Sequence, residues 1–156
     1  MTTNRAASTG SRRVPPEMPI PLPWLLRRVN QRYRAVVRDR LAEQGLGALP
    51  QPGSWALTAL ARGAHDAAQL VAEMGVSKQA VSKLVDVLVD GGFVDRKVNK
   101  GDRRRTELVL SAQGKRAARV IEDAIRATEQ SFATELGAAP FGDLVALLNK
   151  LATPGE

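Results

Sequence analysis

The feature that most constrains the fold is a pair of short helical segments joined by a very short turn. Asp66 stands three residues before Gln69, the spacing of a capping box, and opens the segment 66–74, which Gly75 closes. Ser77 then caps a second segment, 78–90, which a pair of glycines ends. Only two residues separate Gly75 from Lys78. Two short helices joined so tightly must cross at a steep angle, so residues 66–90 predict a helix-turn-helix.

A basic hairpin is predicted immediately after the second helix. The runs FVDRKV (93–98) and TELVL (106–110) read as strands, and the segment NKGDRRR joins them. Three adjacent arginines in such a loop repel one another unless an anion compensates their charge. A helix-turn-helix followed by a basic hairpin is typical of a winged helix. The predicted fold class is therefore mainly α with a small β-hairpin wing.

The segments on either side of this unit predict further helices and an extended arm. Residues 1–23 hold five of the nine prolines, so we expect a flexible N-terminal arm there. Apolar residues at helical spacing predict a helix over 24–45, and a short helix is expected from Ser54 to about 61. A long helix is expected from Ala112 to about 136 and a last one over about 141–151. The chain thus divides into the arm (1–23), an N-terminal helix (24–45), the winged helix (54–111) and C-terminal helices (112–156).

Composition limits the chemistry of the chain. Cysteine is absent and histidine occurs once, which excludes disulfides, cysteine-ligated metals, thiol redox sensing and histidine-cluster metal sites. The sequence shows no glycine-rich phosphate loop and no pairing of a nucleophile with a base, so we expect neither catalytic residues nor a cofactor. It also lacks an apolar run long enough to span a membrane, and a signal peptide, so we expect a soluble, cytoplasmic protein.

Charge and its placement favour a polyanionic partner. The chain carries 23 basic and 16 acidic residues, for a net charge of +7, and the stretch 95–116 alone holds eight basic against three acidic residues. The exposed face of the second helix offers hydrogen-bond donors near its N-terminus, where recognition helices meet base edges. The predicted DNA-binding residues of helix and hairpin are Ser77, Lys78, Gln79, Ser82, Lys83, Arg96, Asp102, Arg103 and Arg104. Taken singly, the helix face also fits an ordinary solvated surface, and the hairpin charges fit surface ion pairs.

The stretch 69–115, QLVAEMGVSKQAVSKLVDVLVDGGFVDRKVNKGDRRRTELVLSAQGK, resembles the multiple antibiotic resistance regulator (MarR) family of bacterial transcription factors. The resemblance extends over roughly 24–151, with Val71 and Met74 as departures from the common pattern. It implies a winged helix-turn-helix homodimer, built from its N- and C-terminal helices, that binds pseudo-palindromic double-stranded DNA operators. It places Ser77, Lys78, Gln79, Ser82 and Lys83 on the major-groove helix. It places Asp102 and Arg104 on the Asp-x-Arg pair of the wing, with Arg103 beside them.

The resemblance also implies a small-molecule effector. Family members often bind aromatic or phenolic ligands between the dimer helices and the DNA-binding lobe. Candidate lining residues offer aromatic faces, a cation and hydrogen bonds: Trp24, Arg28, Tyr33, Trp55 and His65. Each also fits a structural role. Trp55 and Tyr33 suit the core, Trp24 the anchoring of a helix start, Arg28 a surface and His65 a helix cap.

The sequence favours two functions. The first is a sequence-specific transcriptional regulator, more readily a repressor than an activator, because a compact dimer represses by occluding a promoter. The second is a low-specificity architectural DNA-binding protein. Arg12 and Arg13 of the arm suit a minor groove, while its prolines suit packing across a partner subunit; an arm with neither role is the third possibility.

Overall fold

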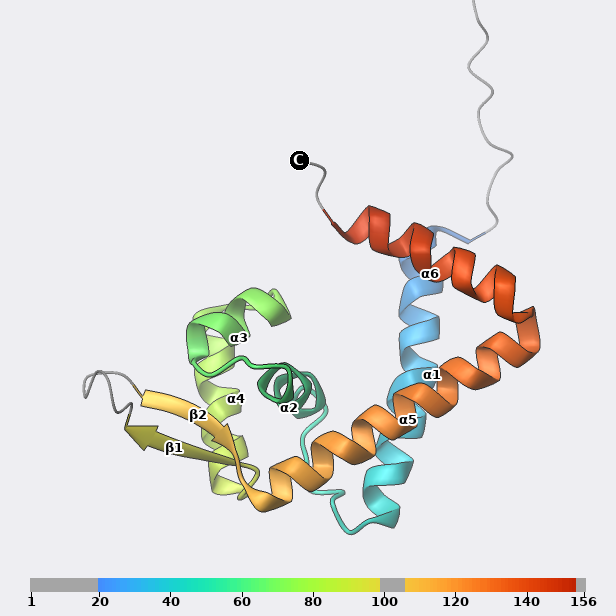
Figure 1. Ribbon diagram of the computed structural model, residues 1–156. Coiled ribbons are helices and arrows are strands. Elements are labelled where there is room, and N and C mark those ends of the chain that lie inside the picture. Colours follow the sequence, from blue (N-terminus) through green and yellow to red (C-terminus); the bar gives the residue numbers. More distant parts are fainter. Residues whose placement is uncertain (1–19, 99–105, 154–156) are drawn as a thin grey trace, which may run out of the picture.

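The computed structural model describes residues 20–98 and 106–153, which form helices and one two-stranded antiparallel sheet (Figure 1). The elements, in chain order, are α1 (Leu22–Glu43), α2 (Gly53–Ala61), α3 (Ala67–Met74), α4 (Lys78–Asp90), β1 (Val94–Val98), β2 (Thr106–Leu110), α5 (Ala112–Leu136) and α6 (Ala138–Ala152). The predicted fold class, mainly α with a hairpin wing, is confirmed. In the described part of the chain, no helix has the length and apolar character needed to cross a membrane.

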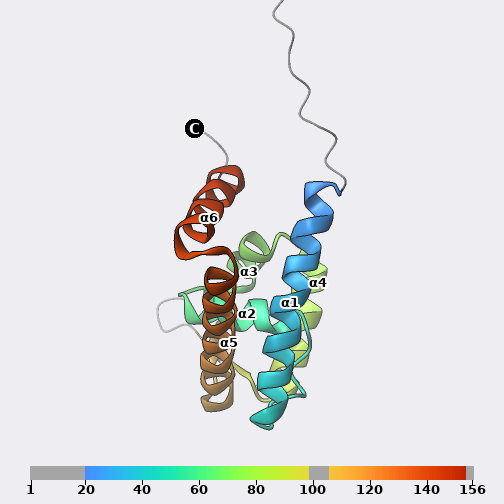
Figure 2. The same ribbon diagram turned by 90° about the vertical axis from the view of Figure 1, so that its right-hand side faces the viewer.

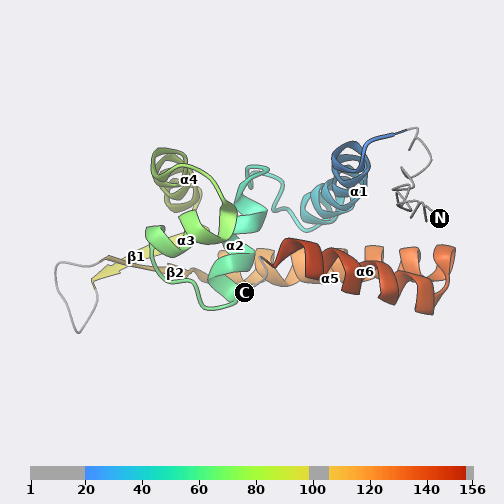
Figure 3. The same ribbon diagram turned by 90° about the horizontal axis from the view of Figure 1, so that it is seen from above.

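The long helix α5 links two groups of elements (Figures 1 and 2). At one end of α5 lie α2, α3, α4 and the hairpin. Further along its length, α5 packs beside α1. At Gly137, whose φ is 93°, the chain turns back into α6, which packs against α5. Seen from above, α1 and α4 lie on the same side of α5 (Figure 3).

The helix-turn-helix forms from the capping residues that predicted it. Asp66 Oδ1 accepts a hydrogen bond from the Gln69 amide at 2.9 Å, and Ser77 Oγ accepts one from the Ala80 amide at 3.2 Å. Gly75 ends α3 with a φ of 63°, a left-handed conformation that glycine adopts without steric cost. The Gln69 side chain accepts from the His65 amide at 2.7 Å, one residue before the position of a standard capping box.

Two helices begin two or more residues earlier than predicted. Helix α1 begins at Leu22 and not at 24, with Pro23 in its first turn, and α6 begins at Ala138 and not near 141, with Pro140 in its first turn. Proline is tolerated there because first-turn amides have no partner within the helix. Most of the predicted arm, residues 1–19 with Arg12 and Arg13, lies outside the described residues.

A single apolar core joins the winged helix to α5. The side chains of Leu57, Leu70, Val81 and Leu88 are fully buried, and Ile121 meets them from α5 with 1% of its surface exposed. One stripe of α5 faces the core: Val120 is half-buried, and the buried members are Ala117, Ile121, Ala124, Thr128 and Phe132. The position of α4 relative to α5 is therefore set by close apolar packing.

A compact joint connects the hairpin to the start of α5. Ser111 Oγ donates to the Gly92 carbonyl at 2.6 Å and accepts from the Gly114 amide at 3.0 Å, while the Ser111 amide donates to the Phe93 carbonyl at 3.1 Å. Gly114 is buried, and a Cβ atom added there would lie 1.9 Å from the Phe93 carbonyl oxygen. The absence of a side chain at position 114 is what lets the two segments approach so closely.

Candidate nucleic-acid interface

The outer face of α4 presents the predicted donors to solvent. Val81, Val85 and Leu88 are buried against the core, and this fixes the rotation of the helix about its axis. The opposite face and the cap residue are exposed, and they carry Ser77, Lys78, Gln79, Ser82 and Lys83. Within this set the two lysines bring positive charge, and glutamine and serine bring neutral donors. The structure therefore gathers all five predicted helix residues on one accessible surface.

Arg96 is placed differently from the other predicted contacts. On β1 it pairs in register with Leu108 of β2, and its Nη2 atom lies 2.5 Å from Asp86 Oδ1 on α4. The Arg96 guanidinium therefore forms an ion pair with a residue of α4. The remaining predicted wing residues, Asp102, Arg103 and Arg104, lie in the segment 99–105, outside the described residues.

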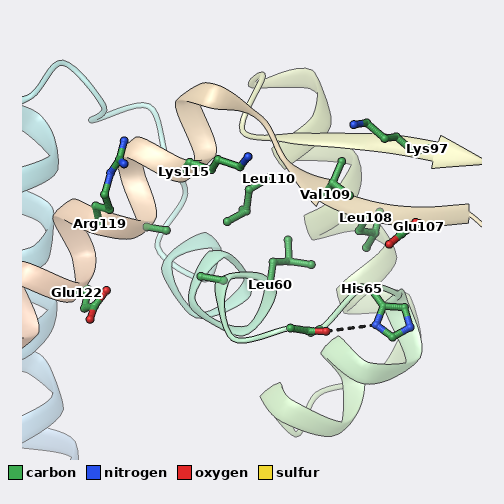
Figure 4. A pocket seen from close by; sticks show the side chains of 14 residues that line it. Leu60, His65, Lys97, Glu107, Leu108, Val109, Leu110, Lys115, Arg119 and Glu122 are labelled. Atoms are coloured by element: carbon green, nitrogen blue, oxygen red, sulfur yellow. Dashed lines mark hydrogen bonds between the residues drawn. The ribbon is translucent and has the colours of Figure 1, made fainter.

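A pocket of about 840 Å³ lies between the end of α2, strand β2 and the first half of α5 (Figure 4). Apolar side chains form part of its wall, including those of Leu60, Leu108 and Leu110. Its ionisable lining residues are His65, Lys97, Glu107, Lys115, Arg119 and Glu122. Counting His65 as neutral, three cations face two carboxylates, so the pocket suits a small anion with an apolar body.

The pocket wall is continuous with the wing. The His65 carbonyl accepts a hydrogen bond from the Leu108 amide at 2.8 Å, which ties the α2–α3 connection to β2. His65 Nδ1 also lies 3.2 Å from the Gly63 carbonyl (dashed in Figure 4). Lys97 lies directly opposite Glu107 in the hairpin register, so both strands contribute to the pocket.

The other predicted pocket residues lie elsewhere in the chain. Trp24 and Arg28 are exposed on α1, and Trp55 is exposed on α2. Tyr33 packs edge-on against Phe132 of α5, with ring centroids 5.4 Å apart. Burial raises the pKa of the Tyr33 phenol, and the Glu129 carboxylate raises it further, so the phenol stays neutral.

Of the five candidates, then, His65 lines the pocket, and a single chain does not bring the other four to it. The sequence analysis did not identify the charged residues that α5 contributes to the pocket. These residues are Lys115, Arg119 and Glu122, whose spacings of four and three place them on one face of the helix. That spacing was a usable signal once a pocket beside α5 was suspected.

Metal binding finds no support in the part of the chain that the structure describes. No group of three or more Asp, Glu and His side chains gathers there in an arrangement that could hold an ion.

Comparison with known proteins finds a family match over the winged helix. Residues 50–105 match the model of the MarR family. A Thauera aromatica protein described as a transcriptional regulatory protein for the hcr operon is 33% identical over 82 residues. The match covers 53% of this chain and 49% of that protein, so it spans about half the length of the curated relative.

Solved structures share the fold over most of the chain. The Mycobacterium tuberculosis MarR family protein Rv2887, solved in complex with DNA, is 27% identical with a TM-score of 0.62, over 86% of this chain and 99% of that one. A mutant of Escherichia coli MarR complexed with operator DNA is 22% identical with a TM-score of 0.68, over 86% and 95%. The sequence match to the MarR family over residues 50–105 agrees with the winged-helix fold that the chain shares with the solved MarR family structure Rv2887.

Proposed function

We propose that this protein is a dimeric, sequence-specific DNA-binding transcriptional regulator that acts as a repressor. The observation that carries the proposal is the outer face of α4, where exposed donors stand opposite a fully buried apolar face. Glutamine pairs with adenine, lysine with guanine, and serine with several bases, so this face suits the major groove. Rv2887 and E. coli MarR, which share the fold, were solved with DNA, and this supports the same partner here.

Dimerisation is proposed from two apolar surfaces that a single chain leaves uncovered. Within its described length α6 has no buried residue, although Leu144, Leu147 and Leu151 follow a helical stripe and are 43%, 59% and 74% exposed. On the first turns of α1, Trp24 is 60% exposed and Val29 is 43% exposed. Apolar surface of this extent marks an interface, and a second copy of the chain supplies a matching one. A two-fold dimer then presents two α4 helices to inverted half-sites roughly one DNA turn apart.

The pocket beside α5 is proposed as an effector site for a small aromatic or phenolic carboxylate. Lys115 and Arg119 provide cations for the carboxylate, and Leu108 and Leu110 provide apolar contact for a ring. Rv2887 was also solved in complex with p-aminosalicylic acid, which has this chemistry. Because the pocket shares residues with both strands of the wing, occupancy is expected to alter the wing and to lower the affinity for DNA.

The test of the regulator is selection from a randomised duplex library at about 150 mM salt, where non-specific binding is weak enough to reveal preference. We expect enrichment of an inverted repeat. Enrichment of no motif would instead support the architectural alternative, which predicts a small ratio between the affinities for selected and random DNA.

Gln79→Ala is expected to relax the base preference at one position of each half-site. The expected loss on the selected sequence is about 1–3 kcal/mol, while the salt dependence of binding stays unchanged, because the side chain is neutral and reads a base edge. Repeated selection with the variant measures this. Gln130→Ala, at an exposed position of α5, is the matched control and should leave the motif intact. An unaltered motif with Gln79→Ala would remove this side chain from base readout.

Arg119→Ala is expected to blunt the response to an effector. Titration of p-aminosalicylate into the protein–DNA complex should lower the affinity for DNA in the wild type, and about tenfold more ligand should be needed in the variant, which lacks one charged hydrogen bond. Arg116→Ala, three residues earlier and outside the pocket lining, is the control. Equal responses of the two variants would count against this pocket as the effector site.

A further inference from the structure

Arg96 lies on the inner side of the wing. Along β1 it alternates with Lys97 and shares a face with Val94, which is 1% exposed, and its register partner Leu108 is 5% exposed. This is the face that packs toward the helices, because side chains two residues apart in a strand point the same way. Within the described part of the chain, the guanidinium makes an ion pair with Asp86 of α4.

Asp86 stands on the DNA-facing surface of α4. It follows Ser82 by four residues and Gln79 by seven, so it continues the face that carries the donors. A carboxylate on that face repels the phosphate backbone of a duplex. Its side chain is 54% exposed and that of Arg96 is 45% exposed, so water screens the pair in the free protein. Docking on DNA removes much of this water, and the pair then matters more.

We propose that Asp86 and Arg96 form a specificity device, in which Asp86 holds the Arg96 guanidinium away from phosphate while Arg96 masks the charge of Asp86. The proposal rests on the DNA-binding function proposed above. A phosphate contact raises affinity for every sequence equally and carries no sequence information. Holding one arginine in an internal pair therefore lowers the affinity for random DNA while leaving the base-reading donors of α4 in place. Arg96 is, on this proposal, a positioning residue that fixes the wing against the recognition helix.

Asp86→Asn is expected to strengthen binding to random DNA. Releasing Arg96 adds about one phosphate contact per half-site, which steepens the slope of log affinity against log salt by about 0.9 for each contact. The affinity for random DNA at about 150 mM salt should rise about fivefold per contact. The ratio of specific to random affinity should fall. Asp90→Asn, which makes the same charge change one turn further along α4, is the control and should leave the slope unchanged.

Arg96→Gln and the double variant Asp86→Asn/Arg96→Gln complete the cycle. Arg96→Gln should weaken binding to the selected operator, because it exposes the Asp86 carboxylate to the phosphates of the duplex. The double variant should recover the operator affinity to within about twofold, since neither charge then remains. Thermal melting of each variant verifies that it is folded.

The outcomes separate the possibilities. A double variant that binds the operator as weakly as Arg96→Gln would show that Arg96 contacts phosphate directly, and an unchanged slope for Asp86→Asn would show an inert surface pair. Either result overturns the proposal. Wild-type protein that retains no duplex would instead overturn the DNA-binding function itself, so the two failures are distinguishable.

Discussion

Gly114→Ala should lower the free energy of unfolding by about 3 kcal/mol, the upper end of the usual cost of overpacking a core. The added Cβ would lie 1.9 Å from the Phe93 carbonyl oxygen and 3.0 Å from its carbonyl carbon. Both are backbone atoms, so the clash is relieved only by moving the α4–β1 connection or the first turn of α5. The same movement stretches the hydrogen bonds of Ser111 to Gly92 and Phe93.

Thermal denaturation at fixed protein concentration measures this effect. A loss of about 3 kcal/mol lowers the midpoint by roughly 10 °C for a domain of this size. Gly142→Ala is the matched control, because its Cβ would meet no atom within 4 Å and it lies inside α6. That change should stabilise the protein by about 0.5–1 kcal/mol, since alanine favours the helix. Equal midpoints for the two variants would show that the joint accommodates a side chain.

Leu147→Glu should convert the proposed dimer to monomers. Leu147 is 59% exposed and lies in the middle of the apolar stripe of α6, where a second copy would bury it. Removing a carboxylate from water without a partner costs several kcal/mol, and a two-fold interface contains the change twice. We expect the dissociation constant of the dimer to rise by about a hundredfold or more. Operator affinity should fall with it, because each monomer then binds one half-site alone.

Light scattering across a concentration series measures the dissociation, and operator binding is measured in parallel. Asn149→Glu adds the same charge two residues away, on the opposite face of α6, and should remain dimeric. If Leu147→Glu also remained dimeric and bound its operator normally, α6 would lie outside the dimer interface.

The local elements were predictable because short-range chemistry determines them. Asp66 and Ser77 cap the helices that they were predicted to cap, and the alternating runs after Gly92 form the hairpin. The helix starts were less accurate. Proline suggested the unstructured arm at positions 21 and 23, yet it is compatible with a first helical turn, and α1 begins at Leu22.

The candidate site was predictable in its helix and not in its pocket. The donors of α4 share one face because of helical periodicity. Burial of Val81, Val85 and Leu88 on the opposite face turns the donors toward solvent. Pocket residues have no such local rule. The aromatic rings of Trp24 and Trp55 suit an aromatic ligand, but the positions of these residues depend on how α1 and α2 pack. Both side chains are exposed, and neither lines the pocket.

The sequence by itself determined the helix-turn-helix, the wing, the family resemblance and the exposed face of α4, since each follows from spacing along one segment. The tertiary structure decided what distant segments do together. It brought Arg96 of β1 to Asp86 of α4, and Lys115 and Arg119 of α5 to a pocket beside His65. These contacts depend on the angles between elements, which close packing of the shared core sets and which no local pattern encodes.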